Sequence, residues 1–321
     1  MSVYTLVERH QLEKFLTHYN LGHLVAYQGI NAGIENTNYF VTTTAGEFVL
    51  TLFERIDYND LPYFLELMAY IAEHQIPSAH PLADKQGHYL RKLNDKPAAL
   101  VERLGGQDVT TPNLAQCRAI GEALGHLHAI SPAFPSYHAN ERGPHWWKVT
   151  AERVLPLMEK DDANLLLAEL HFQANYQDID LPRGVIHADL FRDNALFQGD
   201  ELGGIIDFYY ACNDVIIYDL AVTINDWCRL NDGCQLDEQR VQAIFEGYQQ
   251  QRTLIPLEYE RWPVMLRAAA LRFWLSRLED FHFPRPGEIT HTKNPVVFRD
   301  ILKAHIEAGD ERIVLLEKLN I

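Results

Sequence analysis

A short island of predicted strands constrains the fold of this chain more than any other part of the sequence. Residues 184–187, 195–197 and 202–208 are apolar and rich in β-formers, and a turn at residues 198–201 separates the last two segments. The loop at residues 188–194, which joins the first strand to the second, carries most of the island's polar side chains. Because long helical patterns lie on both sides, the sequence predicts an α+β fold rather than an all-helical one.

The polar residues of this island have the spacing of a loop that serves phosphoryl transfer. His187 is followed two residues later by Asp189, Asn194 lies five residues further, and Asp207-Phe208 follows a short apolar strand. Phosphoryl transfer needs a carboxylate that orients the acceptor hydroxyl, for which Asp189 is the candidate catalytic base. It also needs oxygen ligands for magnesium, for which Asn194 and Asp207 are the candidates.

A simpler interpretation is that these Asp and Asn side chains only cap turns, as most such residues in loops do. Asp207 argues against it, because a carboxylate that ends an apolar strand has no packing purpose there. We therefore favour the catalytic interpretation for Asp189, Asn194 and Asp207. For His187 we expect a structural role, in which its side chain supports the loop by hydrogen bonding.

The chain divides into a strand-rich first part and a helical second part. In the first, residues 37–42 and 47–53 are predicted to form a hairpin, and residues 61–73 have the apolar spacing of a single helix. Past a strand at 98–104 and a linker near 102–107, the predicted helices span 114–127, 151–176, 236–251 and 258–281. We therefore predict two lobes joined by this linker; the family resemblance described below places them at residues 1–102 and 103–321.

A glycine-containing loop in the first lobe is a candidate for nucleotide binding. Gly29, Gly33 and Asn36 lie between two predicted strands, where backbone N–H groups can approach phosphate closely. An ordinary hairpin loop would look the same, and only the downstream catalytic string favours the functional interpretation. Kinases of this kind place a lysine on the strand that here is residues 48–53, opposite a helix glutamate that here is Glu66; this strand has no lysine.

Composition excludes several classes of function. The formal net charge of -16 disfavours attachment to nucleic acid or to anionic lipid. No uncharged apolar stretch is long enough to cross a bilayer, and the N-terminus has no secretory signal pattern, so we expect a cytoplasmic protein without membrane partners. The four cysteines are best interpreted as buried free thiols, because their spacing does not suit a metal site. They are Cys117, Cys212, Cys228 and Cys234.

Several segments together resemble the aminoglycoside phosphotransferase and choline kinase branch of the protein-kinase-like fold, and within it the bacterial homoserine kinases. The resemblance covers nearly the whole chain. The segments that carry it are residues 184–194 (GVIHADLFRDN), 204–211 (GIIDFYYA), 218–228 (YDLAVTINDWC) and 266–278 (LRAAALRFWLSRL), supported by 143–147 (GPHWW) and 48–54 (FVLTLFE).

The resemblance implies a reaction and further site residues. The reaction would be phosphorylation of L-homoserine by ATP with Mg²⁺, a step toward threonine. Glu102 and Leu104 match the hinge whose backbone meets the adenine, and Asp219 matches an aspartate that steadies the catalytic loop. Thr51 stands at the position of the missing lysine, which departs from the usual clamp on the triphosphate.

The acceptor pocket is the least determined part of the site. A small zwitterion needs a cation near its carboxylate and an oxygen near its ammonium group. By similarity of position the candidates are Asp226, Trp227, Arg267, Arg272 and Trp274. Each also has an ordinary interpretation, because helix arginines commonly pair at the surface and tryptophans commonly pack in the core.

Two other functions stay open at this point. The same catalytic residues would serve a kinase for choline, methylthioribose or another small alcohol. The missing lysine would also suit a nucleotide-binding scaffold without catalysis. The sequence does not indicate an oligomeric state.

Overall fold

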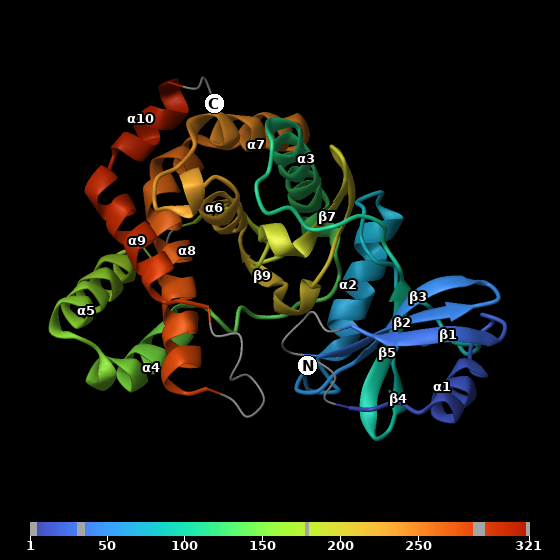
Figure 1. Ribbon diagram of the computed structural model, residues 1–321. Helices are drawn as coiled ribbons and strands as arrows, with labels where there is room; N and C mark the ends of the chain where they lie inside the picture. The colour runs from blue at the N-terminus through green and yellow to red at the C-terminus, as the bar shows by residue number, and fades with distance from the viewer. Residues whose placement is uncertain (1–4, 31–35, 177–179, 285–292, 319–321) are drawn as a thin grey trace. The chain divides into compact units, whose positions relative to one another are not determined.

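The computed structural model describes residues 5–30, 36–176, 180–284 and 293–318 (Figure 1). The chain forms two compact units. Unit 1 consists of Met1–Gly106 and Gly203–Tyr209, and unit 2 of Gln107–Leu202 and Tyr210–Ile321. The segment around Asp207 therefore belongs with the N-terminal residues. Hydrogen bonding explains this, because the Ile205 amide donates to the Pro77 carbonyl at 2.8 Å.

Unit 1 is an antiparallel sheet covered by one helix on each face (Figure 1). Residues of α1 share a buried cluster with Leu100, whereas residues of α2 share another with Ala99, the next residue on the same strand. The hairpin and the helix at 61–73 predicted from the sequence are confirmed. The sheet order is β1-β2-β3-β5-β4, with β1 (Leu24–Gly29), β2 (Thr37–Thr43), β3 (Gly46–Leu52), β4 (Arg91–Leu93), β5 (Lys96–Glu102), α1 (Arg9–Leu16) and α2 (Leu61–Glu73).

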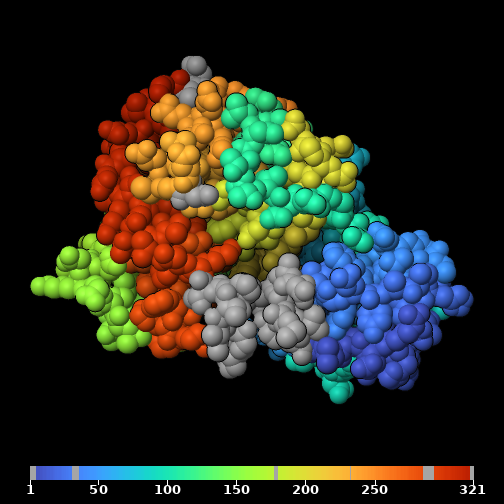
Figure 2. All heavy atoms as spheres, in the orientation of Figure 1, coloured from blue at the N-terminus to red at the C-terminus, as the bar shows by residue number. Residues whose placement is uncertain are grey.

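Unit 2 is mainly helical, and α8 (Pro256–His282) is its central element, which contacts α4, α5, α6, α9 and α10. The helices α9 and α10 form one edge of the unit, shown in red in Figure 2. The other helices are α3 (Leu114–Ile130), α4 (Pro144–Val154), α5 (Lys160–Ala174), α6 (Ile216–Trp227), α7 (Glu238–Gln251), α9 (Val296–Ala308) and α10 (Glu311–Lys318). The strand β6 (Arg183–Ile186) pairs with β9 (Cys212–Val215), and β7 (Ala195–Gln198) pairs with β8 (Glu201–Ile205). None of the helices in the described ranges could span a membrane.

The prediction of one helix over residues 151–176 is wrong. The structure ends α4 at Val154, continues with a 3₁₀ turn at Leu155–Leu157 and starts α5 at Lys160. Pro156 explains the break, because its ring clashes with the preceding helical turn and it has no N–H to donate. The sequence reading also missed α6, whose residues are all buried, since a helix without a polar face gives no 3.6-residue pattern.

Two helices of unit 2, α3 and α7, pack backbone against backbone through glycines. A Cβ atom on Gly247 would lie 2.0 Å from the Arg118 carbonyl oxygen, and one on Gly121 would lie 2.0 Å from that of Ile244. A Cβ on Gly125 would lie 2.5 Å from the Tyr248 carbonyl oxygen. No side chain fits at these positions unless the helices separate.

A buried histidine ties α9 to α6. His305 Nε2 lies 2.7 Å from Asn225 Oδ1, and Asn225 Nδ2 donates in turn to the Leu266 carbonyl of α8 at 2.9 Å. Asn225 Oδ1 can only accept, so His305 carries its proton on Nε2. Burial lowers the pKa of His305 to about 3, so this link consists of a neutral imidazole.

We expect Gly247→Ala to lower the free energy of unfolding by about 1 to 3 kcal/mol, although alanine ordinarily stabilises a helix relative to glycine. The reason is the contact with the Arg118 carbonyl, which forces the helices apart. Urea denaturation measures the change. Gln250→Ala, at an exposed position of the same helix, is the control and should stay within about 0.5 kcal/mol of wild type. A stabilised Gly247→Ala variant would contradict the close packing.

The buried His305 should make stability depend on pH. Below about pH 6.5 the unfolded chain protonates this imidazole and the folded chain does not, so the free energy of unfolding decreases as the pH falls toward about 3. His305→Gln, which can still donate to Asn225, should flatten the slope by up to about 1.4 kcal/mol per pH unit. Denaturation at several pH values between about 7 and 5 tests this, with the exposed His145→Gln as control. Equal slopes in wild type and His305→Gln would contradict it.

Candidate active site

The loop after β6 is held by a buried carboxylate of α6. Asp219 accepts hydrogen bonds from the His187 amide at 2.7 Å and from the Ala188 amide at 2.8 Å. Ala188 has a φ of 64°, a left-handed conformation that is unfavourable for a residue with a side chain. The Asp189 amide donates to His187 Nδ1 at 3.2 Å, so the buried His187 braces the loop from inside. The position of Asp189 therefore depends on Asp219 and His187.

The anchor Asp219 belongs to a longer buried chain of polar groups. His128 Nε2 lies 3.1 Å from Asp219 Oδ2, and His128 Nδ1 lies 2.8 Å from the Tyr248 hydroxyl. Arg252 donates to that hydroxyl at 3.1 Å and pairs with the fully buried Glu258 at 2.9 Å. Burial lowers the pKa of His128, although Asp219 opposes the shift. The neutral ring therefore donates from Nε2 to Asp219 and accepts from Tyr248 on Nδ1, which fixes one tautomer.

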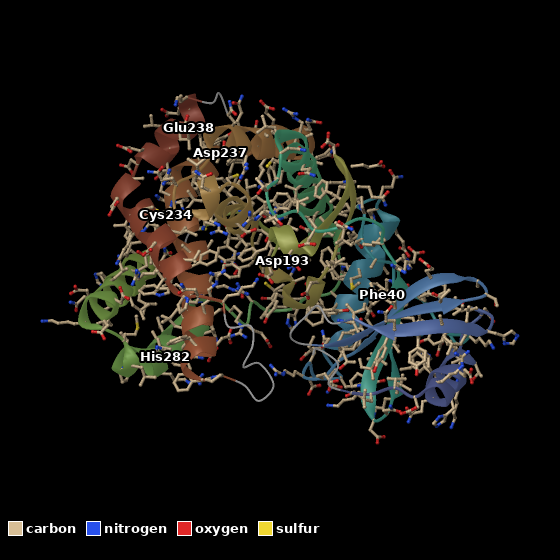
Figure 3. All side chains as sticks on the ribbon, viewed as in Figure 1. Phe40, Asp193, Cys234, Asp237, Glu238 and His282 are labelled. Atoms are coloured by element: carbon tan, nitrogen blue, oxygen red, sulfur yellow. The ribbon has the colours of Figure 1, made fainter. Side chains whose placement is uncertain are left out.

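Asn194 closes the loop from its far end. It lies on a 3₁₀ turn, Arg192–Asn194, and its Nδ2 donates to the Asp189 carbonyl at 2.8 Å. This hydrogen bond leaves the amide oxygen as an acceptor or metal ligand beside the Asp189 side chain, whose Oδ2 lies 3.5 Å from Nδ2. Asp193, labelled in Figure 3, is on the same turn and makes an exposed ion pair with Lys293. The loop thus brings the predicted base and one predicted metal ligand together.

Asp207, the other predicted metal ligand, belongs to unit 1. It follows β8 with a φ of 63°, again left-handed, and a 3₁₀ turn, Phe208–Tyr210, begins at the next residue. Burial and the nearby Asp207 raise the pKa of the Tyr209 hydroxyl, which is also hydrogen-bonded to Thr51. Thr51 itself is buried and donates to Asn38 Oδ1 at 2.8 Å. At the position expected for lysine, unit 1 therefore has a neutral hydrogen-bonding cluster.

The predicted nucleotide residues of unit 1 are only partly described. Gly29 ends β1, and the Asn36 side chain is buried with an amide oxygen that has no hydrogen-bond partner in the described structure. Gly33 lies outside the described residues. Glu102 ends β5, where its amide donates to the His80 carbonyl at 2.9 Å. The Leu104 side chain packs on Gly204, where a Cβ would lie 2.4 Å from Leu104 Cδ1.

Four of the five predicted acceptor residues have side chains engaged inside unit 2. Trp227 is fully buried and donates to the Leu190 carbonyl at 3.1 Å, and Trp274 is only 1% exposed. Asp226 accepts from the Arg192 amide and guanidinium at 2.9 and 3.0 Å. Arg267 pairs with the buried Glu169 at 2.5 Å. Three of these side chains are thus engaged in contacts within unit 2 and Trp274 is buried, while their role in acceptor binding stays a prediction.

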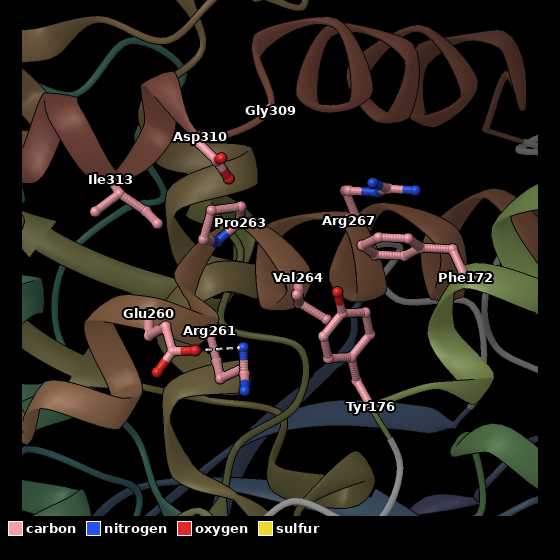
Figure 4. A pocket seen from close by; sticks show the side chains of 10 residues that line it. All are labelled: Phe172, Tyr176, Glu260, Arg261, Pro263, Val264, Arg267, Gly309, Asp310 and Ile313. Carbon is pink, nitrogen blue, oxygen red and sulfur yellow. Dashed lines mark ion pairs between the residues drawn. The ribbon is translucent and has the colours of Figure 1, made fainter.

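Arg267 also lies beside a hollow on unit 2 that is lined by α5, α8 and the turn between α9 and α10 (Figure 4). Its guanidinium stacks on Phe172, with 3.3 Å from Cζ to the ring centroid. In the same hollow, Arg261 pairs with Glu260. The cations that face this hollow are thus already neutralised by neighbouring carboxylates.

Arg277, which lies on α8 close to the loop, is not among the site residues predicted from the sequence. Burial, with the neighbouring Arg229, lowers the pKa of Arg277 to about 10, and the carboxylates of Asp226, Asp193 and Asp189 oppose this shift. It donates to the Asn294 carbonyl at 3.1 Å. Nothing in its sequence context separates it from an ordinary surface arginine.

Comparison with known proteins gives two kinds of relative. The model of the phosphotransferase enzyme family matches residues 26–254. Homoserine kinase of Methylobacillus flagellatus is 48% identical over 311 residues, which are 97% of each chain. Homoserine kinase of Neisseria meningitidis is 44% identical over 302 residues, 94% of this chain and 99% of that one.

Solved structures share the fold at low identity. An amicoumacin kinase in complex with AMP-PNP, Ca²⁺ and Ami matches with a TM-score of 0.70 and 16% identity, covering 96% of this chain and 94% of that one. Spectinomycin phosphotransferase in complex with ADP and spectinomycin matches with a TM-score of 0.66 and 14% identity, covering 98% and 99%. These matches bear out the predicted α+β, protein-kinase-like fold.

We expect Asp219→Asn to loosen the loop. Both Asp219 oxygens accept a backbone N–H, and in the variant one of these acceptors is replaced by an NH₂ group that can only donate. The free energy of unfolding should fall by about 1 to 3 kcal/mol, and the amides of His187 and Ala188 should exchange with solvent faster. Denaturation and hydrogen exchange measure the two effects. Asp193→Asn is the control, since its exposed ion pair contributes at most about 1 kcal/mol. Unchanged exchange at both amides in Asp219→Asn would refute the anchoring role.

Proposed function

This chain belongs to the phosphotransferase enzyme family, and from that premise we propose that it transfers the γ-phosphoryl group of ATP to the hydroxyl of L-homoserine. The products would be O-phospho-L-homoserine and ADP, a step toward threonine. Two observations support the proposal: relatives named homoserine kinase match nearly the full chain, and the anchored loop holds Asp189 beside Asn194. The loop geometry carries most weight, because it holds the candidate base for phosphoryl transfer beside one candidate metal ligand.

In this proposal Asp189 is the catalytic base. Its carboxylate accepts a hydrogen bond from the acceptor hydroxyl, aims the oxygen at the γ-phosphorus and takes the proton as the new P–O bond forms. The bond from the γ-phosphorus to the β,γ-bridging oxygen breaks in the same transfer, and that oxygen leaves with ADP. The backbone amides of His187 and Ala188 keep the loop fixed through Asp219 during this step. Little reorganisation is then needed when the acceptor binds.

Magnesium is the proposed metal, and the donor set suits it. The carboxylate of Asp207 and the amide oxygen of Asn194 are hard oxygen ligands, and the hydrogen bond from Asn194 Nδ2 to Asp189 leaves that oxygen available. When bound with ATP, the ion would supply positive charge beside the β- and γ-phosphates. Among the described residues no group of three or more His, Cys, Asp or Glu side chains could hold a metal ion.

Unit 1 is the proposed source of the nucleotide contacts. Backbone amides around Gly29, Gly33 and Asn36 would face the phosphates, and the backbone at Glu102 and Leu104 would meet the adenine. Thr51 stands at the position of the missing lysine, and its hydroxyl donates to Asn38. In this proposal the triphosphate is therefore held by groups other than a lysine. The cosubstrate ATP makes the cytoplasm the expected site of the reaction.

The experiment is a panel of acceptors with Mg-ATP, in which ADP release is measured for L-homoserine, choline and methylthioribose. We expect L-homoserine to be the best acceptor, and Asp189→Asn to lower kcat by about 10² to 10⁴ while ATP binding is kept. Asp193→Asn is the control on the same turn and should retain activity. Preference for choline would overturn the acceptor, near-normal kcat in Asp189→Asn would overturn the base, and no turnover with any acceptor would favour a nucleotide-binding scaffold.

A further inference from the structure

One arginine of α8 is buried and has no carboxylate partner among the described residues. Arg272 is 4% exposed, and within the same residues its Nε atom has no hydrogen-bond partner. Within the described residues it makes no ion pair, in contrast to Arg267 and Arg252, which pair with the buried Glu169 and Glu258. A buried guanidinium without an anion is unfavourable, so such a residue is retained where a ligand supplies the missing charge.

Aromatic rings shape the surroundings of Arg272. Its Cζ lies 3.8 Å from the centroid of Phe273 and 5.3 Å from that of Tyr210. Ring faces attract a guanidinium and hold its plane, but they satisfy none of its N–H groups. Tyr218 and Cys212 are close enough to feel its charge, which lowers the pKa of both groups against the larger raising effect of burial. The aromatic rings thus orient Arg272, whose Nε donor is unused within the described structure.

Arg272 also lies next to the catalytic loop. Phe273 stacks on Phe191 with 4.4 Å between ring centroids, and Phe191 follows Asp189 by two residues. Tyr210, whose ring also lies near the guanidinium, begins the part of unit 2 that follows the Asp207 segment in the chain. The residue next to Arg272 on α8 thus packs on the loop that carries Asp189.

We propose that Arg272 binds the carboxylate of the acceptor and so selects a hydroxy amino acid over an amino alcohol. This inference rests on the proposed function and assigns a specificity role within that site. A carboxylate supplies the missing negative charge and accepts two parallel N–H bonds from the planar guanidinium. The aromatic rings fix the fork in advance, which reduces the entropy lost on binding. Arg267, which is already bound to Glu169, has no such role.

The test compares two acceptors that differ only in the carboxylate, L-homoserine and 3-aminopropan-1-ol, in wild type and in Arg272→Met. We expect kcat/KM for L-homoserine to fall by about 10- to 150-fold in the variant, since a charge-assisted pair is lost. The value for 3-aminopropan-1-ol should not fall. Arg272→Lys keeps the positive charge but not the planar pair of donors. Its kcat/KM for L-homoserine should therefore lie between those of wild type and Arg272→Met.

Arg267→Met is the matched control on the same helix. It leaves Glu169 buried without a partner, so it should lower Tm and affect both acceptors equally. Arg272→Met removes an uncompensated buried charge, so its Tm without ligand should equal or exceed that of wild type. L-homoserine should raise the Tm of wild type and not that of Arg272→Met.

Three outcomes would overturn the inference. They are equal losses for both acceptors in Arg272→Met, a Tm loss as large as in Arg267→Met, and stabilisation of Arg272→Met by L-homoserine as strong as in wild type. Each would show that Arg272 supports the fold or the loop. The proposed function is judged separately, because the acceptor panel with the wild type and Asp189→Asn tests it and no Arg272 variant is involved.

Discussion

The catalytic loop depends on the two hydrogen bonds that Asp219 accepts from backbone N–H groups. Those amides belong to His187 and Ala188, and the left-handed backbone at Ala188 would otherwise relax toward an extended conformation. A carboxylate is well suited to this task because it only accepts, so both of its oxygens face donors. The turn of the loop, and with it the direction of the Asp189 side chain, follows from one buried charge on α6.

That charge is itself stabilised by a chain of neutral and charged groups across three further helices. His128 on α3, Tyr248 on α7 and the Arg252–Glu258 pair at the start of α8 each satisfy the hydrogen bonds of the next. A fully connected buried network of this kind favours a single arrangement, because any rotated member leaves a partner unsatisfied. The helical unit therefore does more than carry the loop: its interior determines the loop's conformation.

The sequence predicted the local features well and the tertiary ones poorly. A high content of β-formers located the hairpin of unit 1, and helical spacing of apolar residues located the helix at 61–73. The same patterns missed α6, which is buried on all sides, although it carries the anchoring Asp219. For the site, spacing alone brought Asp189 and Asn194 together, since both lie on one short loop. The partners of Arg267 and Asp226 depend on residues far away in the chain, so sequence spacing could not separate these two from Arg272.

The glycine contact between α3 and α7 has a consequence for the precision of the site. Gly125 lies one helical turn before His128, and the backbone it touches is that of Tyr248. The separation of the two helices thus sets the distance between an imidazole and a hydroxyl whose hydrogen bond leads to Asp219. A side chain added at Gly125 would push the two helices apart and so change the geometry of the catalytic loop. Gly125 itself has no place in the proposed substrate site. Inherited variation at this helix contact would accordingly look like an active-site defect.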